Sequence, residues 1–254
     1  MARRDIAGIF KSTVLGAALV AGSALAAQAQ DPGDQAFGPF GGGSGNQLEL
    51  SATTAFTTDY VFRGISQTNQ NPAVQGSLDA SYGMFYVGMW GSNVDFADSL
   101  EIDYYGGIAP TIGGFDLDIG VLWYTYPGAN GIDIVEIKTG GSYTFGDAFT
   151  LGVTNYWGTD SDYDVLEVGG EYAFANEWFN FFTPSVSGVV GFQWADAGTD
   201  YTYWNAGLTL GFLDNWAADI RYWDTDLSDI GCGGAPGAGD NCDGRVVGTI
   251  SASF

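Results

Sequence analysis

The chain has 254 residues and carries 30 acidic against 7 basic residues, a formal net charge of −23. This balance provides no basic surface to neutralise phosphates, so it excludes nucleic acid as a partner. Histidine is absent, which excludes Ser-His-Asp hydrolysis and removes a common zinc and haem ligand. We therefore expect a protein that is not an enzyme and that has no cofactor and no metal site.

The N-terminal segment predicts export. A basic start, Arg3 to Lys11, precedes an apolar run over residues 14–27, and Ala27-Gln28-Ala29 offers a small-residue cleavage site. We expect residues 1–29 to be a cleaved secretory signal peptide. A membrane anchor is the alternative, but the run is short and rich in Ala and Gly. No later stretch approaches the about 20 apolar residues that a membrane helix needs.

The mature chain divides into a leader and a folded domain. Residues 30–45 are rich in Gly and Pro and show no periodicity, which predicts a flexible leader. From there to the C-terminus, over residues 46–254, apolar and polar side chains alternate repeatedly, as in strands with one apolar face. In chain order the alternating stretches cover residues 48–56, 74–82, 85–89, 100–108, 115–123, 135–143, 149–153, 166–174, 182–194, 204–212, 216–222 and 245–254.

The connections between these stretches alternate in length. Very short breaks fall at 83, 113–114, 146–147, 175–178 and 213–215. Mostly longer and more acidic ones fall at 59–72, 93–99, 127–131, 158–163, 195–200 and 225–243. This is typical of an all-β, transmembrane antiparallel β-barrel of about 12 strands, with short periplasmic turns, longer extracellular loops and both termini on the short-turn side. Pro110 and Pro184 are expected to mark a strand end or a bulge.

The charged side chains share the polar face of the strands. In a membrane barrel this face must line the lumen, because a charge facing lipid at mid-bilayer costs about 2–4 kcal/mol. In a soluble secreted β-sandwich, the alternative, the same charges would face water. The set comprises Glu49, Asp79, Glu101, Asp103, Asp116, Asp118, Glu136, Lys138, Glu167, Glu171, Asp219, Arg221 and Arg245. If the lumen is open, its acidic excess favours cations; if the few bases pair with acids, they help to fill a closed interior.

Two short segments and the C-terminus allow more specific predictions. Cys232 and Cys242 lie in one Gly/Asp-rich segment, and in an oxidising compartment we expect them to form a disulfide. The spacing of Asp160, Asp162 and Asp164 imitates a calcium loop, but Val165 stands where Gly is required, so we expect at most a weak ion site. Phe254 ends the last alternating stretch and resembles the terminal signal by which bacterial outer-membrane barrels are recognised for assembly.

The segment Thr57-Thr58-Asp59-Tyr60-Val61-Phe62-Arg63-Gly64-Ile65-Ser66-Gln67-Thr68 is distinctive. With residues 72–76, 86–95, 101–103 and 124–128, it resembles the TorF family of porin-like outer-membrane proteins, from about residue 48 to Phe254. The resemblance implies a barrel in the outer membrane of a Gram-negative bacterium and a role in transport. Asp59 and Arg63 are four residues apart, so on an extended strand they would share a face. We expect Arg63 to be a constriction residue or to form a structural salt bridge near the barrel mouth.

These observations predict an outer-membrane, porin-like channel for passive diffusion of small hydrophilic, preferentially cationic solutes. The alternative is a non-conducting structural or adhesive barrel with acidic surface loops. The expected partners are outer-membrane lipids and lipopolysaccharide, the barrel assembly machinery and small solutes. The residues expected to line or constrict the pore are Asp59, Arg63, Glu101, Asp103, Asp116, Asp118, Glu136, Lys138, Glu167, Glu171, Asp219 and Arg221.

Overall fold

The computed structural model describes residues 47–96, 100–129, 131–159, 163–196, 198–228, 231–232 and 240–254. The expected signal peptide (1–29) and leader (30–45) lie outside these residues, as do Asp160 and Asp162. Within the described ranges no helix is long and apolar enough to cross a membrane. A single 3-10 turn, η3 (Asp240–Cys242), interrupts an otherwise all-β structure there.

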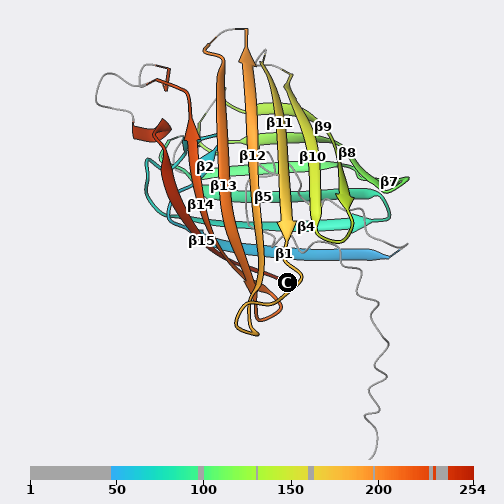
Figure 1. Cartoon of the computed structure of the whole chain (residues 1–254). Coiled ribbons are helices and arrows are strands. Elements are labelled where there is room, and N and C mark those ends of the chain that lie inside the picture. The colour runs from blue at the N-terminus through green and yellow to red at the C-terminus, as the bar shows by residue number, and fades with distance from the viewer. Residues whose placement is uncertain are drawn as a thin grey trace, which may run out of the picture.

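Twelve long strands of the described chain close into a barrel in which every neighbouring pair is antiparallel (Figure 1). They are β1 (Leu48–Thr57), β4 (Ala73–Tyr82), β5 (Phe85–Asn93), β6 (Leu100–Ile108), β8 (Phe115–Thr125), β9 (Ile134–Phe145), β10 (Phe149–Gly158), β11 (Tyr163–Ala173), β12 (Thr183–Ala195), β13 (Tyr201–Phe212), β14 (Trp216–Thr225) and β15 (Arg245–Ser253). Pairing of β1 with β15 closes the barrel. The predicted fold class and strand number are confirmed.

Three short strands are additional to this set and were not predicted. β2 (Val61–Phe62) and β3 (Ile65–Ser66) form a separate two-stranded sheet inside the first long loop. β7 (Thr111–Ile112) pairs with the start of β8 and belongs to the turn between β6 and β8. Pro110 lies just before β7, while Pro184 is the second residue of β12.

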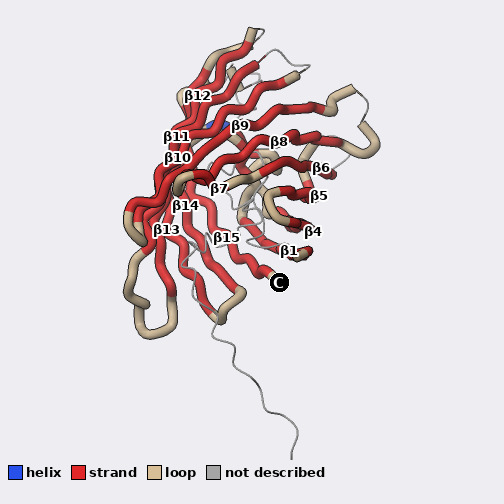
Figure 2. Tube along the Cα trace, turned by 90° about the vertical axis from the view of Figure 1, so that its right-hand side faces the viewer, coloured by secondary structure: helices blue, strands red, loops and turns tan. Residues whose placement is uncertain are grey.

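Turn lengths distinguish the two rims of the barrel. At one rim, the short-turn rim, the strands are joined by residues 83–84, 109–114, 146–148, 174–182 and 213–215, of which only 174–182 is longer than six residues. The other rim carries the two longest connections, residues 58–72 and the segment between β14 and β15, together with shorter ones such as that between β12 and β13. Leu48 pairs with Tyr82 beside the first short turn, and Ala52 exchanges two backbone hydrogen bonds with Phe254. The two ends of the barrel domain therefore lie at the short-turn rim, as expected. Figure 2 shows the C-terminus at the end of β15, next to β1.

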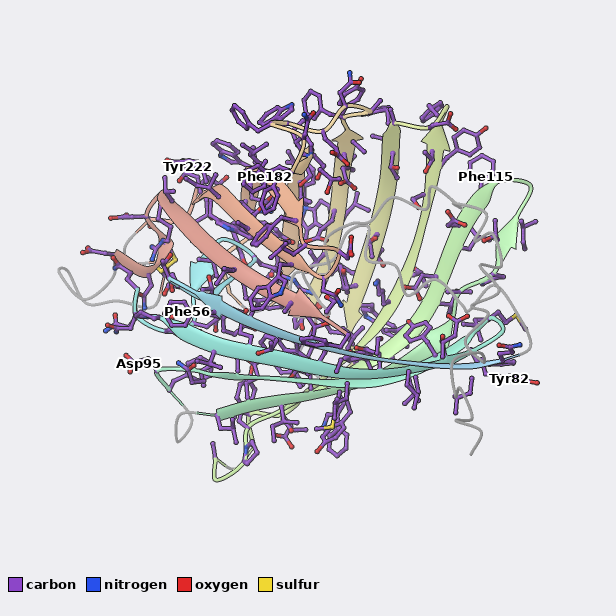
Figure 3. All side chains as sticks on the ribbon, turned by 90° about the horizontal axis from the view of Figure 1, so that it is seen from below. Phe56, Tyr82, Asp95, Phe115, Phe182 and Tyr222 are labelled. Atoms are coloured by element: carbon purple, nitrogen blue, oxygen red, sulfur yellow. A yellow bond between two sulfur atoms is a disulfide. The ribbon has the colours of Figure 1, made fainter. Side chains whose placement is uncertain are left out.

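The outer surface of the barrel is apolar, with an aromatic belt near each rim. Val153 of β10 is 44% exposed while its neighbour Thr154 is 2% exposed, so outward and inward positions alternate. In Figure 3, Tyr82 and Phe115 lie toward one end of the barrel and Phe56 and Tyr222 toward the other. The outward rings are Tyr82, Phe85, Phe115, Phe145, Phe149, Tyr172, Trp216 and Phe254 at the short-turn side and Phe56, Tyr104, Trp123, Trp157, Trp194, Trp204 and Tyr222 at the long-loop side. This distribution is that of a transmembrane barrel.

The inner face holds the charges. Asp103 and Glu136 are fully buried, and Glu101, Lys138, Glu167, Glu171, Asp219 and Arg221 are nearly so. Glu49 and Asp116 continue the same face toward the short-turn rim, where they are exposed. A soluble β-sandwich would bury its apolar faces and expose these charges; the closed barrel does the reverse.

A charge on the outer face tests this arrangement. Val153 lies in the middle of β10 and faces outward, so Val153→Arg should lower the free energy of unfolding by about 2–4 kcal/mol when the protein is folded into lipid bilayers. Val153→Leu, which keeps the site apolar, should stay within about 0.5 kcal/mol of the wild type. Denaturant titrations in lipid vesicles measure both values. An equal, small effect of both substitutions would contradict a lipid-facing β10.

Candidate functional site

The first long loop, residues 58–72, turns inward after β1 and places a hairpin in the lumen. Its strands β2 and β3 are joined by Arg63 and Gly64, whose φ angles are +49° and +83°. Positive φ at both central residues gives the tight two-residue turn that suits a hairpin. Arg63 is only 2% exposed although it lies at the apex. The prediction that Asp59 and Arg63 share one extended strand is therefore wrong, because the chain reverses at Arg63.

Arg63 binds the barrel wall across the lumen. Its two terminal nitrogens, Nη1 and Nη2, donate to Oε1 and Oε2 of Glu136 at 2.7 and 2.9 Å. Glu136 belongs to β9, and the strands β4, β5, β6 and β8 separate β9 from β1 along the shorter arc of the barrel. The hairpin thus starts at one wall and its apex reaches another. A bidentate arginine–carboxylate contact is among the strongest hydrogen-bonded pairs in proteins.

Tyrosine hydroxyls complete the surroundings of this ion pair. Tyr124 and Tyr163 also donate to Glu136, at 2.9 and 2.5 Å. The Arg63 guanidinium carbon lies 4.6 Å from the ring centre of Phe62 and 4.9 Å from that of Tyr156, within the range of cation–π attraction. Burial by itself would lower the pKa of Arg63, but the Glu136 carboxylate raises it above its ordinary value. The guanidinium therefore stays charged, and the pair is a true buried salt bridge.

The other side of the apex presses against β13 and β14. A Cβ atom added to Gly64 would lie 2.9 Å from Cβ of Tyr203 and 3.2 Å from Cβ of Thr225. Only glycine allows the backbone to approach these strands so closely. The hairpin apex is therefore held between β9, through Arg63, and the β13–β14 wall, through Gly64.

A buried aromatic layer surrounds the hairpin. The ring of Tyr60 lies 5.3 Å from that of Trp90 on β5, and the ring of Phe62 lies 5.9 Å from that of Tyr124 on β8. One continuous cluster of buried side chains includes Tyr60, Ala73, Trp90, Val94, Tyr105, Leu122, Tyr124, Tyr156, Val165, Tyr201 and Tyr203. Because these residues come from the hairpin and from strands around the barrel, the hairpin and wall form one packed layer across the lumen.

The base of the hairpin is attached to the last loop. Asp59 accepts hydrogen bonds from Ser66 Oγ at 2.6 Å and Thr68 Oγ1 at 2.8 Å, which link the two limbs of the loop. Its other carboxylate oxygen accepts from Arg245 at 3.0 Å. Arg245 also donates to the backbone carbonyls of Asp240 and Asp243. The predicted disulfide between Cys232 and Cys242 is present; it closes a loop that includes Asp240, and Asp243 directly follows that loop.

The remaining basic residues on the strands also pair with acids. Lys138 lies 3.0 Å from Asp118, and Arg221 lies 3.1 Å from Asp219. With Arg63 and Arg245, this places every base of the described chain in a salt bridge. The structure therefore shows the pairing of bases with acids that the sequence offered as an alternative. Asp116 is separate: it lies near the short-turn rim, exposed, and accepts from Thr111 Oγ1 at 2.6 Å.

Lumenal tyrosines are the functional residues that sequence reasoning missed. Their hydroxyls donate to inward-facing acids, in the pairs Tyr86–Asp118 (2.7 Å), Tyr126–Glu101 (2.7 Å), Tyr203–Glu167 (2.5 Å) and Tyr105–Asp79. Their inward orientation could have been predicted from the alternation of faces along a strand. Tyr105, for example, stands two residues after Asp103 and therefore lies on the same face of β6. The hairpin also had a signal in the sequence, the Arg63-Gly64 break between Val61-Phe62 and Ile65-Ser66.

The calcium-like spacing does not form a site among the described residues. Asp164 and Glu171 lie on β11, and Val165 is buried within that strand. Asp160 and Asp162 lie outside the described residues. Within the ranges that the structure covers, no three His, Cys, Asp or Glu side chains are grouped so as to hold a metal ion.

An antiparallel barrel with an apolar outer face, aromatic belts and a charged lumen defines the class of outer-membrane porin-type barrels. Solved structures agree at the level of the fold. "KdgM porin" superposes with a TM-score of 0.57 at 9% identity, covering 80% of this chain and 99% of that one. "KdgM porin in complex with disordered oligogalacturonate" gives 0.55 at 8% identity, covering 82% and 99%. The NanC porin gives 0.51 at 12% identity, covering 81% and 99%.

The chain belongs to the family described as "Bacterial protein of unknown function (Gcw_chp)", which matches residues 42–254. A comparison with curated proteins found no match. The resemblance to the TorF family stays a prediction, because the family shown is Gcw_chp. Phe254 lies exposed at the short-turn rim beside Ala52, and its role as an assembly signal also stays a prediction.

A pair of glycine substitutions tests the contact between the apex and the wall. Gly64→Ala and Gly83→Ala both place a side chain at positive φ, but only at Gly64 would the new Cβ meet other atoms. Overpacking of this kind costs about 1–3 kcal/mol, so Gly64→Ala should lower the free energy of unfolding by at least about 1 kcal/mol more than Gly83→Ala. Denaturant unfolding of both variants measures the difference. Equal losses would mean that the apex does not rest on β13 and β14.

Proposed function

We propose that the protein is an outer-membrane channel for passive diffusion of small hydrophilic solutes, with a preference for cations. The closed barrel and its charged inner face support this proposal, since a polar lumen inside an apolar exterior is the arrangement of a transmembrane conduit. Export by the signal peptide, insertion through the assembly machinery acting on Phe254, and contact of the acidic loops with lipopolysaccharide belong to the same proposal.

The charge balance of the lumen carries the preference for cations. Lys138, Arg221 and Arg245 are the bases on the inner face of the strands, and each lies against an acid. The inward-facing acids of the barrel strands are more numerous: Glu49, Asp79, Glu101, Asp103, Asp116, Asp118, Glu136, Glu167, Glu171 and Asp219. A conduit lined by excess negative charge attracts cations and repels anions. The oligogalacturonate bound by the KdgM porin is a polyanion; we propose a different class of solute for this chain.

The packed layer around the hairpin favours a second candidate, a non-conducting structural or adhesive barrel. Tyr60, Trp90 and Tyr203 are at most 3% exposed, so the lumen is filled at that level in this conformation. A permanently filled barrel would pass no current. The two candidates therefore differ in one measurable property, ion conductance.

Planar-bilayer recording tests the proposal. The purified protein should give stepwise currents, with a reversal potential in a KCl gradient that shows K⁺ favoured over Cl⁻. Replacing two lumenal acids outside the hairpin's contacts, in Asp79→Asn/Asp116→Asn, should move the permeability ratio toward one because the attracting charge falls. Asp147→Asn removes a charge from an exposed turn and serves as the control. Anion preference in the wild type, or equal shifts in both variants, would contradict the cation assignment.

A further inference from the structure

We propose that the pocket around Glu136 is a binding site for organic cations bearing a guanidinium or primary ammonium group, and that Arg63 occupies it from within the chain. A solute of this class would compete with Arg63 and release the hairpin, residues 60–67, from the lumen. The release step rests on the proposed channel function. The binding step does not, because it concerns only the chemistry of the wall.

The wall supplies what such a cation requires. Glu136 is fully buried and offers both carboxylate oxygens to one guanidinium, at 2.7 and 2.9 Å. Tyr124 and Tyr163 donate to the same carboxylate and so hold it in place. The ring of Tyr156, on β10, faces the guanidinium at 4.9 Å. A fixed carboxylate beside aromatic faces is the usual recognition element for guanidinium and ammonium groups.

The ligand that now fills this pocket belongs to a removable element. β2 and β3 hydrogen-bond to each other and form a sheet of their own, separate from the barrel sheet. The barrel ladder is complete without them, since β1 pairs with β4 and β15 up to Thr57. Withdrawal of residues 60–67 therefore breaks side-chain contacts and the backbone hydrogen bond from Asp95 to Gln67, but no hydrogen bond of the barrel ladder.

The base of the loop is held independently of the apex. Asp59 binds Thr68 and Arg245, which both lie outside residues 60–67, and Arg245 donates to Asp240 in the disulfide-closed last loop. Loss of the Arg63–Glu136 contact would leave these bonds in place. The hairpin can thus leave the lumen while its base keeps it next to the mouth, and the vacated carboxylate is then open to an external cation.

Chemical rescue tests the binding step without any conductance. Arg63→Ala removes the internal ligand and leaves Glu136 buried without its guanidinium, so the purified variant should melt below the wild type. Methylguanidinium chloride at millimolar concentration should restore its melting temperature by roughly 3–5 °C once its concentration is about ten times its Kd. Equal KCl should have no effect, and Arg63→Ala/Glu136→Gln should show no rescue. No shift in the single variant, or an equal shift in the double variant, would overturn the proposed site.

Bilayer currents test the release step. Residues 60–67 can be replaced by two glycines, because the side chains of Asp59 and Thr68 lie 2.8 Å apart and the gap is short. This variant should conduct continuously, whereas the wild type should open rarely and more often with methylguanidinium than with K⁺. Arg221→Ala, which removes an arginine side chain from the wall instead of the hairpin, should not raise the open fraction.

Wild-type currents equal to those of the shortened variant would overturn the release step, while the proposed channel function would remain supported. Absence of current in a folded shortened variant would overturn the channel and the release step, while the rescue experiment still decides the binding site.

Discussion

The need to satisfy every backbone hydrogen bond in hydrocarbon is the constraint on which this structure depends. An open sheet would leave a row of unpaired N–H and C=O groups facing lipid, at several kcal/mol each. Pairing of β1 with β15 removes that edge and converts twelve strands into a closed wall. Closure then decides which environment each side chain meets, because alternate positions face either lipid or the lumen. The charged residues are inside for this reason, and the exposed Leu, Val, Phe and Trp side chains are outside.

The barrel interior holds many acids and few bases, and a buried carboxylate is costly unless it has a charged or hydrogen-bonding partner. The structure provides each of several carboxylates with such a partner nearby. Each base of the described chain lies against an acid, and several of the other acids accept a tyrosine hydroxyl. The tyrosine pairs supply a hydrogen bond without adding charge, so the excess of negative charge is kept while buried carboxylates gain donors. A lumen that retains this excess is suited to cations. The solute class that we propose follows from this balance.

The first loop uses the same chemistry for a different purpose. Among the bases of the described residues, Arg63 is the one that does not come from a barrel strand. The tight turn at Arg63-Gly64 brings it to a carboxylate on a distant part of the wall. A buried ion pair of this kind contributes little net stability over an apolar replacement, but it is costly to leave half-made. The Arg63–Glu136 pair therefore fixes the position of the hairpin more than it adds to the stability of the fold. Because a half-made pair is costly, the hairpin is expected to be either fully bound in the lumen or fully released.

Local regularities made much of the fold predictable. Three features depend only on neighbouring residues and were therefore predictable without distant contacts: the alternation from Phe115 to Trp123, the turn at Gly146-Asp147 and the last strand, which was expected to end at Phe254. The position of Arg63 could not be predicted in this way. Its partner Glu136 is 73 residues away, and the turn that brings them together contradicts the extended geometry expected from spacing alone.

The sequence by itself determined the alternation of faces, the even number of strands, the lengths of the turns and the acidic excess, because each depends on side-chain order along a short stretch of chain. Only the tertiary structure decided which acid each base meets, that tyrosines share the lumen with the carboxylates, and that the first loop crosses the barrel. Those contacts depend on barrel closure and strand register, which bring together residues that no local pattern connects.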